Sequence, residues 1–160
     1  MNTLIHPIAP FLFPDSRLLV LGSFPSVKSR ESGFYYGHPQ NRFWQVLALV
    51  FDEERPCSTD DKKALLARHG IALWDVIHSC TVTGSADASI RDARPNEVQR
   101  AIAGSAVQAV FLNGQLAGRL YRANRHLMPR LPHHILPSTS AANAAWSLPR
   151  LVQAWAVLKG

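Results

Sequence analysis

The order of apolar runs and helical patterns along the 160 residues predicts an α/β fold. We expect three layers, α/β/α, around a central, mainly parallel sheet of four strands. Four short apolar runs bounded by turn residues predict the strands, and segments with apolar residues at helical spacing alternate with them. The chain has neither an internal repeat nor a linker rich in proline, serine or glycine, so we expect a single domain over residues 1–160. Sheets of this type bind ligands at the carboxyl ends of their strands.

The first expected strand is the apolar run at residues 17–21, which is short and ends at Gly22. A long loop follows at residues 23–40, because proline and glycine interrupt any regular period there. Asn41 can then cap a helix in which apolar residues recur at helical spacing as far as residue 50. The loop therefore leads directly into a helix N-terminus.

The second strand is predicted at residues 71–77, another buried apolar run. A helix is expected before it at residues 62–69, and Gly70 ends that helix. Residues 78–95 are predicted to form a loop, and residues 96–103 a helix behind a proline. This part of the chain thus repeats the alternation of strand, loop and helix.

The last two strands are predicted at residues 109–112 and 133–136, with a helix at residues 115–124 between them. Residues 137–147 form a loop of small residues, which lets backbone approach a ligand closely. An amphipathic helix at residues 148–158 ends the predicted fold. Each long loop follows a strand, so we expect the loops to meet at one edge of the sheet.

The composition excludes several classes of protein. Apolar residues make up 47% of the chain, too many for a disordered protein, and no run approaches the about 20 apolar residues of a membrane helix. Cys57 and Cys80 are the only cysteines, too few for a disulfide framework or an iron–sulfur cluster. The net charge of +6 favours an anionic partner. Because the N-terminal segment lacks a basic region and contains three prolines, we expect a cytoplasmic protein without a signal peptide.

The first loop combines aromatic side chains with glycine and proline. It contains GSFPS at residues 22–26 and, further on, YYGHPQNRFW at residues 35–44. Rings beside such turns can form a slot for a flat heterocycle, since stacking a base on an aromatic ring contributes roughly 1–3 kcal/mol. The same rings could instead fill the core. In combination, the two strings favour a planar ligand.

These strings, with others along the chain, resemble the uracil-DNA glycosylase superfamily. HPQNRFW at residues 38–44 matches the end of the family's first motif, whereas Phe24 stands where many members carry the asparagine that positions the attacking water. The set GSFPS, YYGHPQNRFW, LWDVI, GSAD, FLNG and LPSTSAANA resembles the hypoxanthine-DNA glycosylase branch, which lacks that asparagine. The resemblance covers residues 17–155. It implies a DNA glycosylase of base excision repair that removes a deaminated base, hypoxanthine in deoxyinosine, flipped out of DNA.

Asn41 and Asp75 are the expected catalytic residues. The resemblance implies a catalytic part for Asn41, and an amide at a helix N-terminus can orient water while the helix end favours negative charge on the departing base. A plain helix cap is the alternative. Asp75 falls where relatives place an amide that reads the base, and a carboxylate there could accept from a ring N–H, orient water or stabilise a cationic sugar. It could also cap a turn.

The resemblance also implies contacts to the base and to the DNA backbone. Tyr36 aligns with the ring that stacks on the extruded base, and small hydroxyl residues suit phosphate contact. The residues expected around the base are Gly22, Ser23, Phe24, Tyr36 and Asn113. Those expected to contact DNA are Ser26, Lys28, Ser138, Thr139, Ser140 and Asn143. Ser85 and Asp87 are further candidates.

The lysines bear on the type of reaction. A glycosylase that also cuts the strand needs an amine nucleophile, and of four lysines only Lys28 lies near a motif, where a phosphate contact is the simpler role. We therefore expect monofunctional hydrolysis that leaves an abasic site and uses no cofactor. Histidines at positions 38, 133 and 134 lack metal-binding spacing, so no metal is expected.

The expected partner is DNA, as a damaged duplex or a single strand, bound by a monomer with no membrane contact. Three alternatives stay open. The first is a uracil or G:U/G:T mismatch glycosylase, which the phenylalanine at position 24 disfavours. The second is an enzyme that hydrolyses or transfers free nucleosides, for which the motif loops hold few carboxylates. The third is a non-catalytic nucleic-acid-binding module, for which basic charge and aromatic loops would suffice.

Overall fold

The computed structural model describes residues 2–82 and 90–160. The central strands are β2 (Leu18–Gly22), β3 (Ile71–Asp75), β6 (Ala109–Asn113) and β7 (His133–Leu136). They form one sheet in the order β3-β2-β6-β7, and each neighbouring pair runs parallel. The register places Gly22 opposite Asp75 at the carboxyl ends of β2 and β3. The predicted four-stranded parallel sheet is therefore confirmed.

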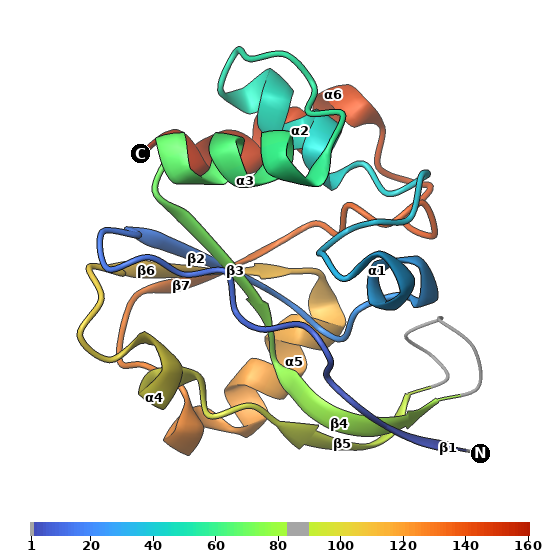
Figure 1. Cartoon of the computed structure of the whole chain (residues 1–160), viewed down its shortest axis with the longest axis vertical. Coiled ribbons are helices and arrows are strands. Elements are labelled where there is room, and N and C mark those ends of the chain that lie inside the picture. The colour runs from blue at the N-terminus through green and yellow to red at the C-terminus, as the bar shows by residue number, and fades with distance from the viewer. Residues whose placement is uncertain (1, 83–89) are drawn as a thin grey trace.

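Helices cover both faces of this sheet, as the α/β/α prediction requires (Figure 1). One face carries α2 (Phe43–Val50), α3 (Thr59–Arg68) and α6 (Leu148–Trp155), and the other carries α4 (Val98–Ile102) and α5 (Gln115–Ala123). The other helical segments are η2 (Arg125–Leu127), η3 (Ala156–Lys159) and α1 (Val27–Ser32), a short helix within the segment that was predicted to be a loop at residues 23–40. Within the described residues, no helix is long and apolar enough to cross a membrane.

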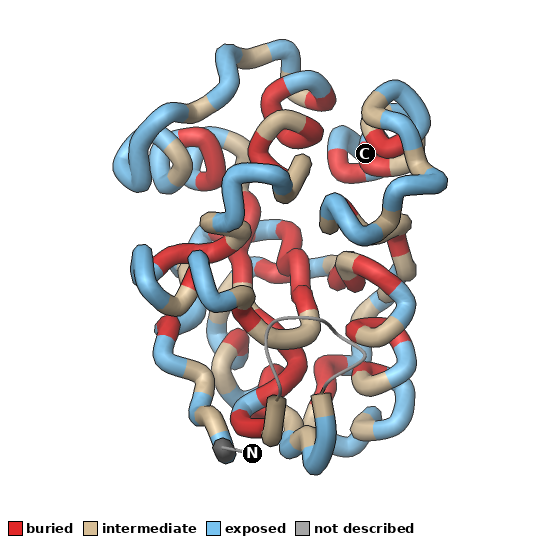
Figure 2. The backbone as a smooth tube through the Cα atoms, turned by 90° about the vertical axis from the view of Figure 1, so that its right-hand side faces the viewer, coloured by how far each residue is buried: buried red, intermediate tan, exposed pale blue. Residues whose placement is uncertain are grey.

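Two apolar clusters, one on each face of the central sheet, hold the layers together. Alternate residues of a strand point to opposite faces, so Val20 joins the cluster that contains Trp155 of α6, whereas Leu21 joins the cluster that contains Tyr121 of α5. Both aromatic side chains are fully buried. Figure 2 shows the buried residues concentrated along the central strands and on the inner sides of the helices.

The segment predicted as a loop at residues 78–95 contains two strands instead. They are β4 (Ile77–Val82) and β5 (Arg91–Pro95), and together with β1 (Asn2–Ile5) they form an antiparallel sheet in the order β1-β4-β5. Most residues of β5 are exposed, so this strand has no apolar alternation by which a sequence pattern could reveal it. Pairing with a distant segment, rather than local preference, sets this second sheet.

The chain passes from the first sheet to the second at Val76. The predicted strand at residues 71–77 therefore divides, and the buried Asn96 holds the corner together. The side-chain amide of Asn96 donates to the backbone oxygens of Asp75 (2.8 Å) and Ile77 (3.2 Å), and its backbone N–H donates to Val76 (2.7 Å). This corner fixes the backbone of Asp75 at the end of β3.

Candidate functional site

A cavity of about 790 Å³ opens at the carboxyl ends of β2, β3 and β6. This volume is within the range of small-molecule sites and is large enough for a nucleobase. The first loop, the start of α5 and the loop after β7 complete its wall. The sequence-predicted residues that line it are Gly22, Ser23, Phe24, Ser26, Tyr36, Asn41, Asp75, Asn113, Ser138, Thr139, Ser140 and Asn143.

Lys28 is the one residue of the predicted set that does not line the cavity. It lies on α1 with its side chain 58% exposed, at 3.8 Å from the carboxylate of Glu31. A phosphate contact by Lys28 stays a prediction. Ser85 and Asp87 lie outside the described residues.

Asn41 uses its side-chain oxygen within the protein. Its Oδ1 accepts from the backbone N–H of Phe43 (2.9 Å) and from the Thr139 hydroxyl (2.9 Å). Arg42, not Asn41, is the N-cap of α2, but the Asn41 side chain binds the N–H of the first residue of the helix from the position before it, while also lining the cavity. Its amide nitrogen makes no hydrogen bond within the described residues, so Asn41 can offer a donor to a ligand.

Thr139 connects Asn41 with Asn113. It is completely buried, and its hydroxyl accepts from the Asn113 amide nitrogen (3.0 Å) while donating to Asn41. Its backbone N–H also donates to the Asn113 oxygen (3.1 Å). Predicted from the sequence as a DNA contact, the Thr139 side chain instead bridges two amides that reach the cavity from different elements.

Arg42 ties the loop after β7 to the start of α2. Its guanidinium donates to the backbone oxygens of Ser140 (3.0 Å), Asn143 (3.1 Å) and Trp146. Its backbone N–H donates to the Thr139 oxygen (3.0 Å). The two motif loops are therefore fastened to each other by the side chain and backbone of Arg42.

Asp75 lies at the floor of the cavity and is only 3% exposed. Its Oδ2 is 2.7 Å from Nε2 of His6, a residue that sequence reasoning did not single out. Its Oδ1 lies over Gly22, where an added Cβ atom would be 2.5 Å from this oxygen. A glycine at position 22 is thus required for the carboxylate to occupy its place. No motif surrounds His6, so nothing in the sequence could have pointed to it.

Tyr36 has a left-handed backbone (φ 53°) and lines the same part of the cavity. Its ring stacks on Phe43 with centroids 4.0 Å apart, so one face of the ring is already covered. Its hydroxyl is 3.0 Å from the position of a Cβ on Gly22 and makes no hydrogen bond among the described residues. Burial, and then the charge of Asp75, raise the pKa of Tyr36, with a small opposing effect of Asn113. The hydroxyl stays protonated and can donate.

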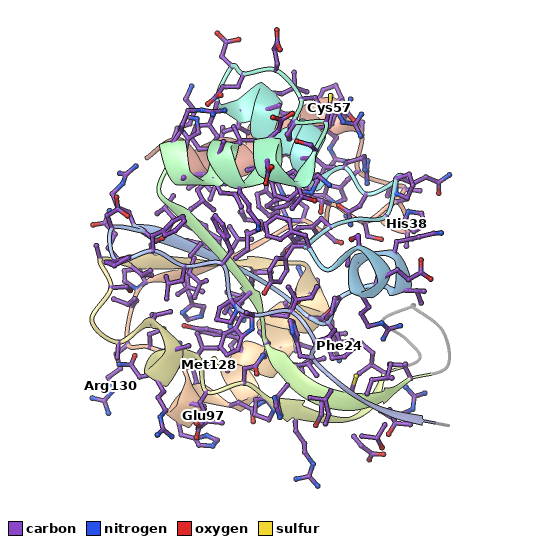
Figure 3. The ribbon with its side chains drawn as sticks, viewed as in Figure 1. Phe24, His38, Cys57, Glu97, Met128 and Arg130 are labelled. Carbon is purple, nitrogen blue, oxygen red and sulfur yellow. The ribbon has the colours of Figure 1, made fainter. Side chains whose placement is uncertain are left out.

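Phe24 lies beside α1, on the side of the molecule from which His38 also projects (Figure 3). Its ring meets His6 edge to face, with centroids 5.7 Å apart, and Arg30 lies over the ring at 5.7 Å. Phe24 is half-buried and lines the cavity. It is therefore available to a ligand while it also covers the imidazole.

Fold and site together define an α/β protein with a nucleobase-sized cavity at the carboxyl edge of a parallel sheet. The family model of the uracil DNA glycosylase superfamily matches residues 9–159. The chain therefore belongs to this superfamily.

Two curated relatives within this superfamily are similar to the chain. A hypoxanthine DNA glycosylase of Methanosarcina acetivorans is 30% identical over 137 residues, which are 83% of this chain and 84% of the relative. One of Methanosarcina barkeri is 30% identical over 112 residues, 68% of this chain and 70% of the relative. The solution NMR structure of a candidate uracil DNA glycosylase from M. acetivorans superposes with a TM-score of 0.79 at 26% identity, over 98% of this chain and 100% of that one.

Proposed function

We propose that residues 1–160 form one DNA glycosylase domain of base excision repair, which hydrolyses the N-glycosidic bond of hypoxanthine in deoxyinosine. The names of the two curated relatives support the substrate. The observation that carries the proposal is the floor of the cavity, where a carboxylate oxygen and an unpartnered hydroxyl lie side by side over Gly22. The enzyme acts on DNA as a monomer, in the cytoplasm at the nucleoid.

The acceptor and the donor at the cavity floor are complementary to the hydrogen-bonding edge that deamination of adenine creates. Adenine presents a ring-nitrogen acceptor next to an amino donor, whereas hypoxanthine presents a ring N–H next to a carbonyl oxygen. Oδ1 of Asp75 can accept from the N–H, and the Tyr36 hydroxyl can donate to the carbonyl. A buried acceptor and donor left unpaired by adenine would disfavour its binding strongly. The pair therefore distinguishes hypoxanthine from adenine, the base from which it arises.

The base must leave the helix before it reaches this floor. Extrusion costs a few kcal/mol and is easiest for a damaged or mispaired base, which adds to the selection. The Tyr36 ring, which stacks on Phe43, meets the base through its hydroxyl, so the half-buried ring of Phe24 offers the face on which the base can stack. Phe24 lines the same space. The deeply buried Asp75 then meets the base, while the sugar stays nearer the half-buried Asn41.

Asn41 orients the attacking water in this arrangement. Cleavage passes through a sugar with oxocarbenium character, so a water placed at the anomeric carbon needs orientation more than proton removal. The amide nitrogen of Asn41 can donate to the oxygen of that water, because the amide oxygen is held by Phe43 and Thr139. None of the four lysines lines the cavity, so no amine nucleophile is at hand and the product is an abasic site.

Duplexes that contain deoxyinosine, deoxyuridine or no lesion test the function. After incubation with the protein, alkali cleaves any abasic site that has formed. We expect breaks at deoxyinosine, and only after alkali. No release from any duplex would refute the glycosylase proposal. Release of uracil alone would refute the hypoxanthine assignment, and breaks without alkali would refute the monofunctional reaction.

A further inference from the structure

His6 follows β1 and reaches the cavity floor from the second sheet. Its backbone N–H donates to the oxygen of His78 in β4 (2.7 Å), which anchors the segment. Its side chain is 3% exposed and is surrounded by the rings of Phe24, Tyr35 and Trp74. A polar ring in such surroundings needs partners for both of its nitrogens.

Both nitrogens of His6 have a partner. Nδ1 accepts from the backbone N–H of Ile8 (3.2 Å), so this nitrogen carries no hydrogen. The hydrogen of the neutral ring is therefore on Nε2, which donates to Oδ2 of Asp75 (2.7 Å). The backbone of Ile8 thus fixes the tautomer, and the tautomer fixes the direction of the hydrogen bond to the carboxylate.

Resting on the proposed function, we infer that His6 is a positioning residue that fixes the plane of the Asp75 carboxylate and so directs one of its two oxygens at the base. The imidazole N–H holds Oδ2, and this leaves Oδ1 over Gly22 as the acceptor for the ring N–H of hypoxanthine. A rotation that tilts the carboxylate out of this plane would break the bond to His6 and turn the accepting oxygen away from the base. His6 thereby contributes to selection of the base without touching it.

The first test compares two replacements of His6. His6→Phe keeps an aromatic ring against Phe24 and removes the donor, so we expect a roughly ten- to hundredfold loss in single-turnover release of hypoxanthine, as for one hydrogen bond to a charged group. His6→Gln keeps a donor, and we expect its rate within about threefold of the wild type. A His6→Phe protein as active as the wild type would overturn the inference.

The second test asks whether His6 dictates orientation. In Asp75→Asn, the N–H of His6 holds the amide oxygen and turns the amide nitrogen, a donor, toward the base. The combination Asp75→Asn with His6→Gln removes this constraint, because glutamine can offer an oxygen to the amide nitrogen. We expect the double variant to release hypoxanthine roughly tenfold faster than Asp75→Asn alone. A double variant no faster than the single one would contradict the inference, since a merely structural role predicts two additive losses.

Two measurements separate this inference from the proposed function. Nitrogen-15 NMR of the imidazoles needs no activity, and we expect the spectrum of His6 to show a hydrogen on Nε2 and none on Nδ1. An Nδ1–H or doubly protonated His6 would overturn the inference even in an active enzyme. Conversely, a wild type that releases no base while His6 shows the expected tautomer would refute the function alone.

His78→Ala is the matched control for the His6 variants. The His78 side chain is exposed on the neighbouring strand, so this substitution should leave the rate of base release unchanged.

Discussion

The two sides of the cavity are organised differently. On one side, Asn41, Thr139 and Asn113 form a chain of hydrogen bonds in which every member belongs to a recognisable motif. On the other side, Asp75 depends on His6, which comes from the N-terminal segment beside the second sheet. On both sides, the residues that face the cavity belong to sequence motifs. The residue that orients them belongs to a motif only on the side of Asn41, because His6 reaches Asp75 solely through tertiary contacts.

The largest expected effect is on the side of Asp75. Asp75→Ala removes the acceptor for the base and leaves the N–H of His6 unpaired, so we expect single-turnover release of hypoxanthine to fall roughly a thousandfold. Circular dichroism should show an unchanged fold. A loss of less than about tenfold would mean that the base is read elsewhere in the cavity.

On the other side, Asn41 can be tested for its two roles separately. Asn41→Ala should lower release roughly a hundredfold and also destabilise the protein by about 1 kcal/mol, because the Phe43 N–H and the Thr139 hydroxyl lose their acceptor. Asn41→Asp keeps an oxygen for Phe43 and Thr139 and replaces only the donor. We therefore expect Asn41→Asp to retain the urea-unfolding midpoint while losing activity like the alanine variant. An active Asn41→Asp protein would show that the donor is not used.

The bridge between the two amides should matter less for rate than for stability. Thr139→Val keeps the shape of a buried side chain but leaves both amides without their shared hydroxyl, at a cost of about 1–2 kcal/mol in unfolding free energy. Release should slow by only about threefold, since Asn41 keeps its bond to Phe43. Thr139→Ser restores the hydroxyl and serves as the control. A rate loss equal to that of Asn41→Ala would place Thr139 in direct contact with the substrate.

The smallest effect on base release is expected for a residue that does not line the cavity. Hydrogen bonds from Arg68 and then His69 lower the pKa of Glu53 from its ordinary value of 4.5. A lowered carboxyl pKa adds stability that is complete above the ordinary value and is lost as the pH falls through the pKa of the folded protein. Because this cluster lies at the surface and its side chains are partly exposed, Glu53→Gln should lower the melting temperature only slightly at pH 7, and less at pH 3. The rate of base release should not change.

The parallel sheet was predictable because its strands are short apolar runs that end in glycine or polar residues, as β2 does at Gly22. β5 was not, because most of its residues are exposed and it holds three charged residues and a proline, so no apolar alternation marks its pairing with β4. In the site, the resemblance to the family motifs identified Asn41 and Asp75, which lie just before α2 and at the end of β3. The bridging part of Thr139 and the presence of His6 could not be foreseen, because both depend on which segments meet in three dimensions.

The most direct measurement compares deoxyinosine with 1-methyldeoxyinosine at one position of the same duplex. The methyl group removes the ring N–H that we assign to Oδ1 of Asp75 and leaves the carbonyl oxygen and the sugar unchanged. We expect the protein to release hypoxanthine and to leave the methylated base in place. Equal release of both bases, or release of neither, would contradict a glycosylase that recognises deaminated bases through Asp75.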